Sequence, residues 1–378
     1  MKILFSGGGT GGHFYPIIAI AQGVNQIIER EKLVGVKIYF MSDSPYDERL
    51  LFENDITFKK ASAGKLRKYF SLRNYFVDPF KTIWGIITAT WKIFWLYPDV
   101  IFGKGGYASF PALWAARILR IPVFIHESDS IPGRVNLIVG KWGIVKRIAV
   151  SYPEAINYFP EGKTALTGNP IRRELLEPVK KGSHEYFGLE KDVPVIFIVG
   201  GSQGAMNIND VIVDSLPELV EKYQIVHHTG KDHFREVAGR AAFLLEKNVN
   251  KGRYKPYAFL DEVALKMIAG VASLVISRAG STIFEIASWG IPSIIIPIPE
   301  EISRDQRKNA FSYARVSDAI VLEERNLSSS ILISEINRVM NDEKLQERMK
   351  EGATKFAKKD AAIKIAEELI KLGLQHEQ

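Results

Sequence analysis

Short apolar runs alternate with longer amphipathic segments along the first half of this chain. The runs that predict buried strands are residues 2–6, 36–42, 100–102 and 122–126. Helices are predicted from about residue 15 to residue 31 and over residues 111–119. Strands that alternate with helices in this way are typical of a parallel sheet covered by helices on both faces.

The same pattern restarts after Asn169-Pro170, and we place the joint between two halves there. A strand over residues 193–199 leads through a glycine-rich turn into a helix that extends to Leu219. The other predicted elements are strands at residues 225–228, 257–260, 274–277 and 293–297 and a helical tail at 342–372. We therefore predict an α/β protein with two doubly wound parallel sheets.

The length of 378 residues agrees with two domains, and 46% hydrophobic and 25% charged residues are typical of a folded globular protein. The absence of cysteine excludes disulfides, thiolate metal sites and cysteine nucleophiles. The longest apolar stretch, residues 82–97, contains Lys92 and is shorter than the roughly 18–20 residues of a spanning helix. The first residues do not resemble a signal peptide, so we expect a cytosolic chain without a spanning helix.

Positive charge is concentrated in the first half of the chain. The net charge is +7, but residues 1–168 hold 21 Lys and Arg against 13 Asp and Glu, whereas the remainder is nearly balanced. Most of the excess lies in residues 59–98, which hold eight Lys and Arg, one acidic residue and ten aromatic residues. Aromatic and cationic side chains together are typical of a surface that contacts lipid headgroups.

We therefore predict that this segment contacts an anionic membrane surface, and the candidate residues are Phe80, Lys81, Trp84, Trp91 and Trp95. Two alternatives stay open from the residues alone. In the first, a helical stripe faces the sheet and belongs to the core; its members would be Ile83, Ile87, Trp91 and Trp95. In the second, single-stranded nucleic acid stacks on the aromatic residues of a basic groove. We favour the membrane and predict no nucleic-acid partner.

A glycine-rich loop, Gly-Gly-Gly-Thr-Gly-Gly-His at residues 7–13, follows the first strand. Glycines let the backbone approach a phosphate, and the N-terminus of the next helix favours an anion. His13 should begin that helix, where imidazolium is disfavoured, and is our candidate for a neutral catalytic base. The loop also fits the dinucleotide pattern Gly-x-Gly-x-x-Gly with Asp43 as ribose ligand, so an NAD(P)-dependent oxidoreductase stays open.

Four other strand ends carry small or polar residues. They are residues 103–107 (Gly-Lys-Gly-Gly-Tyr), 126–129 (His-Glu-Ser-Asp), 200–205 (Gly-Gly-Ser-Gln-Gly-Ala) and 277–285 (Ser-Arg-Ala-Gly-Ser-Thr-Ile-Phe-Glu). Backbone amides in the last of these can hold a diphosphate, and Glu285 lies one helical turn further, within reach of ribose hydroxyls. Gln306, in a polar loop before a helix, suits sugar hydroxyls. The Walker pattern, the nucleophile elbow and metal-ligand spacings are absent from the sequence, so we predict no metal and no cofactor.

Taken together, these motifs resemble the MurG family of glycosyltransferase family 28 over nearly the whole chain. The residues that carry the resemblance, in chain order, are the loop at 8–13, Gly105-Gly106-Tyr107, His126-Glu127, residues 168–172, residues 200–205 and residues 278–285. The resemblance implies a GT-B fold with an acceptor- and membrane-binding domain at residues 1–168 and a UDP-sugar-binding domain at residues 169–349. A C-terminal helix at about residues 350–378 would pack back on the first domain.

The resemblance also implies an activity and a location. The enzyme would move N-acetylglucosamine, with inversion, from UDP-N-acetylglucosamine to the 4-hydroxyl of the muramoyl sugar of undecaprenyl-diphosphate-linked N-acetylmuramoyl-pentapeptide. This is the step from lipid I to lipid II in peptidoglycan synthesis, at the cytoplasmic face of the bacterial inner membrane. Related enzymes that glycosylate diacylglycerol or epimerise UDP-N-acetylglucosamine, and a non-catalytic nucleotide-sugar binder, are the alternatives.

Site residues follow from the resemblance by position. The catalytic residues would be His13 and, as an alternative base, Glu127. The substrate-binding residues would be Thr10, Gly11, Gly12, Gly105, Tyr107, Asp129, Arg172, Ser202, Leu260, Ser281, Thr282, Glu285 and Gln306. The chain departs from the family pattern at Asp129, where many members have Asn, and in a turn after Gly280 that is one residue shorter.

Overall fold

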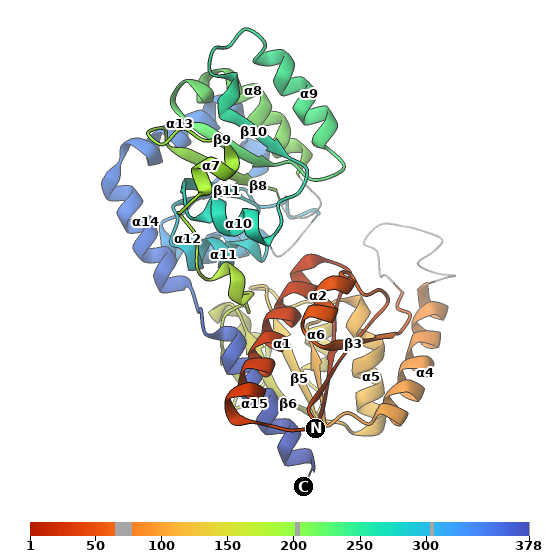
Figure 1. Ribbon diagram of the computed structural model, residues 1–378. Helices are drawn as coiled ribbons and strands as arrows, with labels where there is room; N and C mark the ends of the chain where they lie inside the picture. Colours follow the sequence, from red (N-terminus) through yellow and green to blue (C-terminus); the bar gives the residue numbers. More distant parts are fainter. Residues whose placement is uncertain (65–77, 201–204, 303–305, 378) are drawn as a thin grey trace. The chain divides into compact units, whose positions relative to one another are not determined.

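The computed structural model describes residues 1–64, 78–200, 205–302 and 306–377. The chain divides into two compact units, of which the first comprises Met1–Arg172 with Lys358–Gln378 and the second comprises Arg173–Ala357. The joint therefore lies a few residues beyond the predicted 168/169, and the return to the first unit begins at Lys358 rather than near residue 350. Each unit is a parallel sheet covered by helices (Figure 1), which confirms the predicted α/β fold class.

The first unit contains a seven-stranded parallel sheet with the order β3-β2-β1-β4-β5-β6-β7. Its strands are β1 Lys2–Ser6, β2 Lys37–Ser42, β3 Ile56–Lys60, β4 Val100–Gly103, β5 Val123–Glu127, β6 Val145–Val150 and β7 Thr164–Leu166. The central strands β1 and β4 are buried along almost their whole length because helices cover both faces of the sheet. The winding direction changes between these two strands, and ligands bind beside the carboxyl ends of strands at such a point.

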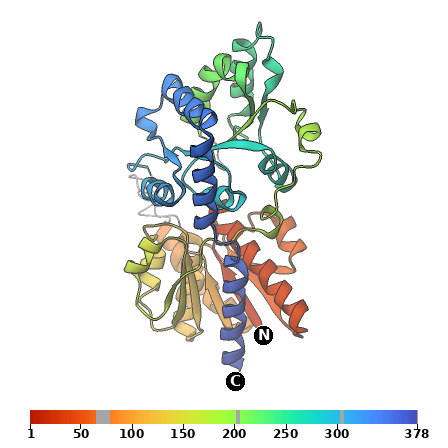
Figure 2. The same cartoon turned by 90° about the vertical axis from the view of Figure 1, so that its left-hand side faces the viewer.

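Two pairs of helices cover opposite faces of the first sheet. The helices of this unit are α1 Gly11–Glu31, α2 Glu48–Glu53, α4 Asp78–Leu96, α5 Phe110–Leu119, α6 Arg134–Val139 and α15 Ala361–Glu377, with 3-10 turns η1 Tyr107–Ser109 and η2 Pro153–Tyr158. Helices α1 and α15 lie side by side in both views (Figures 1 and 2) and share one core cluster, whereas α4 and α5 share another. Gly23 permits the first contact, since a Cβ atom there would be 3.1 Å from the Ala362 carbonyl oxygen.

Helix α4 turns its aromatic residues away from the core. Its buried apolar positions are Gly85, Ala89 and Ile93. A Cβ atom at Gly85 would be only 1.8 Å from the Ser62 carbonyl oxygen, so this face of small residues packs tightly on the unit. The large residues that are 54–70% exposed are Phe80, Ile83, Trp84, Ile87, Trp91, Phe94 and Trp95. The alternative in which the stripe of Ile and Trp faces the sheet is therefore wrong.

The second unit contains a six-stranded parallel sheet with the order β10-β9-β8-β11-β12-β13. Its strands are β8 Val195–Val199, β9 Gln224–His228, β10 Tyr254–Tyr257, β11 Ala272–Ser277, β12 Ser293–Ile295 and β13 Ile320–Val321. The strand predicted at residues 257–260 is wrong in position, because β10 ends where the prediction begins. Pro256 is tolerated in β10 since that strand is at the edge of the sheet, and the Asp261 carboxylate accepts the Ala264 N–H at 2.9 Å to start a helix.

The helices of the second unit include the first part of the predicted helical tail. They are α7 Ser183–Phe187, α8 Met206–Lys222, α9 Phe234–Leu244, α10 Glu262–Ala269, α11 Thr282–Trp289, α12 Gln306–Ser317, α13 Ser329–Asn341 and α14 Glu343–Phe356, with 3-10 turns η3 Arg173–Leu175, η4 Lys251–Arg253 and η5 Glu324–Asn326. The tail predicted to be helical at 342–372 consists of two helices, α14 and α15. They are separated where the chain leaves the second unit at Ala357 and enters the first at Lys358.

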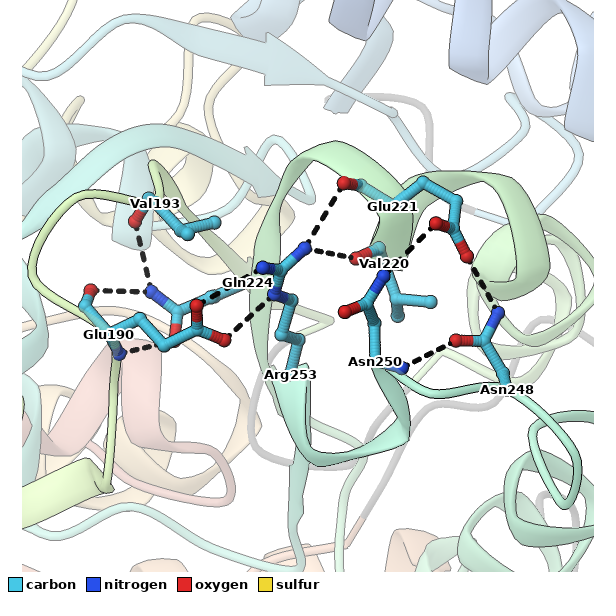
Figure 3. Close-up of polar contacts among 8 residues, drawn as sticks. All are labelled: Glu190, Val193, Val220, Glu221, Gln224, Asn248, Asn250 and Arg253. Carbon is cyan, nitrogen blue, oxygen red and sulfur yellow. Dashed lines mark hydrogen bonds and ion pairs between the residues drawn. The ribbon is translucent and has the colours of Figure 1, made fainter.

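A network of hydrogen bonds and one ion pair links the residues at the amino-terminal ends of β8, β9 and β10 (Figure 3). The Arg253 guanidinium contacts both carboxylate oxygens of Glu190, at 2.8 and 3.1 Å, and donates to the carbonyl oxygens that end α8. Gln224 bonds the main chain of Glu190 and Val193. The network lies at the sheet edge opposite the turn between β11 and α11, so we assign it a structural role.

Within the described residues, no helix is both long and apolar enough to cross a membrane. The same part of the chain holds no group of three or more His, Cys, Asp or Glu side chains arranged to bind a metal ion.

Candidate active site

The glycine-rich loop after β1 leads directly into α1 at the carboxyl edge of the first sheet. Gly8 and Gly9 have φ values of +128° and +84°, which residues with a side chain rarely adopt. A Cβ atom at Gly9 would also lie 2.7 Å from the ring of Tyr107. Thr10 is the N-cap of α1, but its side chain makes no capping hydrogen bond, and the first helical turn holds no acidic residue. The positive end of the helix is therefore available to an anion.

His13 lies in the first turn of α1, because that helix begins at Gly11 rather than near residue 15 as predicted. Its Nδ1 atom is 2.9 Å from the hydroxyl oxygen of Thr10, and its Nε2 atom would be 3.3 Å from a Cβ atom at Gly106. Desolvation by the surrounding protein and the Lys104 ammonium lower the pKa of His13 to about 4. The imidazole is therefore neutral at physiological pH and can accept a proton.

Tyr107 and Asp43 connect the ends of β4 and β2. The Tyr107 hydroxyl donates to the Asp43 carboxylate at 3.0 Å, and burial together with this carboxylate raises the pKa of Tyr107. The Ser42 hydroxyl donates to the same carboxylate at 3.2 Å. An oxidoreductase would need the Asp43 carboxylate to bind a ribose. In the structure this carboxylate instead accepts hydrogen bonds from the hydroxyls of Tyr107 and Ser42, which argues against that alternative.

Glu127 is fixed at the end of β5 by three N–H donors. Its Oε1 atom accepts the Asp129 backbone N–H at 3.0 Å, and its Oε2 atom accepts the Gly133 N–H and the Asn136 side-chain amide, each at 2.9 Å. Burial and the Asp129 carboxylate raise the pKa of Glu127 to about 7. Because its oxygens are occupied in holding the turn at residues 127–133, Glu127 is a poorer candidate for the base than His13.

The remaining predicted residues of the first unit pack beside these groups. The buried Arg172 guanidinium lies 4.1 Å from the ring centre of Tyr15, on α1. Gly105 has a φ of +85°, and a Cβ atom there would be 2.8 Å from the Asn136 side chain. The first unit thus holds nine of the predicted catalytic and substrate-binding residues: Thr10, Gly11, Gly12, His13, Gly105, Tyr107, Glu127, Asp129 and Arg172.

In the second unit, the turn between β11 and α11 gathers four predicted residues. Helix α11 begins at Thr282, with Ser281 as its N-cap and Glu285 in its first turn. Gln306 begins α12 beside this turn, since its Nε2 atom would be 3.8 Å from a Cβ atom at Gly280. Leu260 is buried in the segment between β10 and α10, and Ser202 lies outside the described residues.

Arg278 holds this turn in place through contacts that no local sequence pattern indicates. Its guanidinium donates to the carbonyl oxygens of Ile296 and Pro297 at 3.2 and 3.3 Å and pairs with the buried Glu324 carboxylate of η5. Burial lowers the pKa of Arg278. The motif drew attention to Arg278, but no local pattern identifies Glu324 as its partner. The pair positions the turn and does not leave the arginine to contact a ligand.

Comparison with known proteins identifies the family. Residues 3–149 match the glycosyltransferase family 28 N-terminal domain, and residues 195–365 match the glycosyltransferase family 28 C-terminal domain. A Pediococcus pentosaceus protein named UDP-N-acetylglucosamine--N-acetylmuramyl-(pentapeptide) pyrophosphoryl-undecaprenol N-acetylglucosamine transferase is 34% identical over 96% of this chain and 97% of its own length.

Two solved structures share the fold. MurG of Acinetobacter baumannii aligns with a TM-score of 0.72 and 24% identity, covering 98% of this chain and 99% of that one. The UDP-GlcNAc 2-epimerase of Neisseria meningitidis, bound to UDP-GlcNAc, aligns with a TM-score of 0.67 and 16% identity over 98% of this chain and 100% of that one. With both domains matched and a full-length relative above 30% identity, the chain belongs to glycosyltransferase family 28 and, within it, to the MurG family.

Proposed function

We propose that this protein transfers N-acetylglucosamine from UDP-N-acetylglucosamine to the muramyl sugar of N-acetylmuramyl-(pentapeptide) pyrophosphoryl-undecaprenol, the step from lipid I to lipid II in peptidoglycan synthesis. The observation that carries the proposal is the 34% identity with an enzyme of that name over 96% of this chain. A neutral His13 beside the positive end of α1 supports it, because the transfer needs a base and a place for phosphate.

The reaction is a direct displacement with inversion. The acceptor's 4-hydroxyl oxygen forms a bond to the anomeric carbon while the bond from that carbon to the UDP oxygen breaks. His13 takes the hydroxyl proton, and UDP departs with the bonding electron pair. Backbone amides at Ser281 and Thr282, at the N-terminus of α11, stabilise the negative charge that develops on UDP.

Under this proposal, each part of the two substrates is bound by particular residues. Ser281 and Thr282 bind the α-phosphate, Glu285 the ribose hydroxyls, Leu260 the uracil through its backbone and Gln306 the transferred sugar. Arg172 and Ser202 contact the nucleotide phosphates. Thr10, Gly11 and Gly12 contact a substrate diphosphate, and the acceptor side also includes Gly105, Tyr107 and Asp129. The grouping of four donor residues around one turn supports these assignments.

The direct test is transfer of radiolabelled N-acetylglucosamine from its UDP conjugate to a lipid I analogue. Label should appear in the lipid product with release of an equal amount of UDP. UDP binding without transfer would instead indicate a non-catalytic nucleotide-sugar binder. Transfer to diacylglycerol in place of the lipid I analogue would assign the acceptor to a different lipid.

Replacing Glu285 by alanine should raise the KM for UDP-N-acetylglucosamine by about tenfold, because a charged hydrogen-bond acceptor for the ribose hydroxyls is lost. Steady-state kinetics with varied donor and isothermal titration with UDP would measure the effect. The matched control is Glu343→Ala, which removes an exposed glutamate from the first turn of α14. An unchanged donor KM in the Glu285 variant would remove this residue from the donor site.

The exposed face of α4 supports contact with a membrane surface. Trp84, Trp91 and Trp95 are 62–68% exposed, and Lys81 is exposed beside them. A surface of several large aromatic side chains is unusual on a protein that meets only water, whereas aromatic and cationic side chains favour the headgroup region of a bilayer. We assign this face to the anionic surface of the cytoplasmic membrane, which holds the lipid acceptor.

A basic pocket at the amino-terminal edge of the first sheet also supports contact with a membrane surface. Helices α4 and α5 pack together, and both run toward the amino-terminal edge of the sheet, where each leads into a strand. At that edge a pocket of about 620 Å³ is lined by Trp142 and four cations, which are Arg117, Arg120, Lys141 and Lys146. Arg117 lies 4.9 Å from the ring centre of Trp142. Such a pocket suits an anionic lipid headgroup.

Replacing Trp84, Trp91 and Trp95 together by serine should weaken binding to vesicles containing phosphatidylglycerol by about tenfold or more, since their apolar area no longer enters the headgroup region. Vesicle co-sedimentation would measure the affinity. The control replaces Phe52 and Phe243, which are 84% and 78% exposed elsewhere, by serine. Equal vesicle binding by the triple variant and the native chain would contradict the assignment of α4.

A further inference from the structure

Lys104 is a buried cation that has no ion-pair partner among the described residues. It follows β4, where its backbone N–H donates to the Ser6 carbonyl oxygen at 2.9 Å, and its Cβ atom would be 3.0 Å from a Cβ atom at Gly7 of the glycine-rich loop. The residue is 1% exposed, and among the described residues its Nζ atom has no hydrogen-bond partner. Lysine is almost never buried without a partner, because the ammonium loses its hydration.

The charged and titratable groups that act on Lys104 come from two neighbouring elements. His13 lies on α1, His126 and Glu127 end β5, and Asp129 follows β5. The Glu127 carboxylate is already bound by three N–H donors, so it attracts the ammonium through space without pairing with it. Burial lowers the pKa of Lys104 to about 8, and the two carboxylates oppose that shift. The side chain is therefore still protonated at neutral pH.

A positive charge at this place lowers the pKa of both candidate bases, but this has opposite effects on their charge. It lowers the pKa of His13 and that of His126, and so disfavours imidazolium. It also lowers the pKa of Glu127, and so favours the carboxylate that holds the turn at residues 127–133. A neutral imidazole is the form of His13 that can take the proton in the proposed transfer, and an ionised Glu127 is the form that accepts the three N–H donors of its turn.

We propose that Lys104 is a positioning residue whose buried ammonium, unpaired among the described residues and held between the glycine-rich loop and the end of β5, shifts the titration of His13 and of Glu127 to lower pH and so widens the range in which His13 is neutral and Glu127 is ionised. This inference rests on the proposed function, since it concerns the base of that reaction. A lysine that served only to fill space would be replaced by methionine without any change in how these two groups titrate.

The kinetic test compares the dependence of kcat/KM on pH in three variants. In Lys104→Met the acidic limb should move to higher pH by about one unit, because both His13 and Glu127 lose a nearby cation. The activity lost at neutral pH should return in part as the pH is raised. Lys104→Arg keeps the charge and should keep the native profile. The matched control is Lys37→Met, which removes an exposed lysine at the start of β2.

A titration of the free protein separates this inference from the proposed function. The imidazole signals of the seven histidines are followed by NMR, and His13→Gln identifies the signal of His13. Its midpoint should rise by about one unit in Lys104→Met and stay in place in Lys104→Arg and Lys37→Met. A folded Lys104→Met protein with an unchanged His13 midpoint and an unchanged acidic limb would overturn the inference. A native chain without transferase activity would overturn the proposed function, while the titration would still test Lys104.

Discussion

Replacing His13 by glutamine should lower kcat for N-acetylglucosamine transfer by about 10²–10⁴-fold, the usual effect of removing a general base. Glutamine keeps a polar side chain of similar size but accepts no proton. The structure makes His13 suited to this role, because the protein around it and the Lys104 ammonium hold its pKa near 4, and its Nδ1 atom contacts the Thr10 hydroxyl at 2.9 Å. That contact orients the ring and leaves its Nε2 atom on the side of Gly106.

The measurement is single-turnover transfer to a lipid I analogue at saturating donor, with UDP affinity determined in parallel. UDP affinity should change little, because the residues assigned to the nucleotide belong to the second unit except Arg172. His184→Gln, on α7, is the matched control and should keep native turnover. A His13→Gln protein within a few-fold of native kcat would assign the proton to a carboxylate, and Asp129→Asn would then be the variant to compare.

Local sequence signals were sufficient to predict most of the fold. Strands β1, β4 and β5 are continuous apolar runs, because a strand covered on both faces tolerates few polar residues. Strands β3, β6, β7 and β13 were not predicted. Strand β7 is short, lies at the edge of its sheet and is partly exposed, so it carries no such run. Strand β10 contains Pro256, which is tolerated because the strand lies at the edge of its sheet. The apolar residues that follow Pro256 led us to predict the strand at residues 257–260 instead.

In the candidate site, too, only the features that depend on local sequence were predicted. Glycine-rich turns after strands are local features, so the loop before α1 and the turn before α11 were found from the sequence. The burial of Lys104 depends on β1, β5 and α1 meeting around it, and the sequence indicates only one ammonium between glycines. The orientation of α4 likewise depends on which face packs on α5, since both of its faces carry apolar residues.

Replacing Lys104 by methionine should stabilise the first unit by about 3–4 kcal/mol at pH 7, although it lowers activity there. Burial lowers the pKa of this lysine from 10.5 to about 8 in the folded chain, and each unit of pKa difference corresponds to about 1.4 kcal/mol. Between these two values the unfolded chain binds more protons than the folded chain. The free energy of unfolding of the native protein should therefore rise as the pH increases from about 8 to 10.5.

The methionine variant lacks this titration, so its advantage over the native chain should be largest below pH 8 and should vanish near pH 10.5. Native-state hydrogen exchange at the β1 and β4 amides measures the unfolding free energy of the first unit separately from that of the second. Lys37→Met should change it by less than about 0.5 kcal/mol, as is usual for an exposed side chain. Lower protection in Lys104→Met than in the native chain at pH 7 would mean that the ammonium is stabilised by a partner, and its role in setting the protonation of His13 would lose its physical basis. A cation that weakens the fold and is nonetheless present at the strand ends beside His13 is better explained by the reaction than by stability.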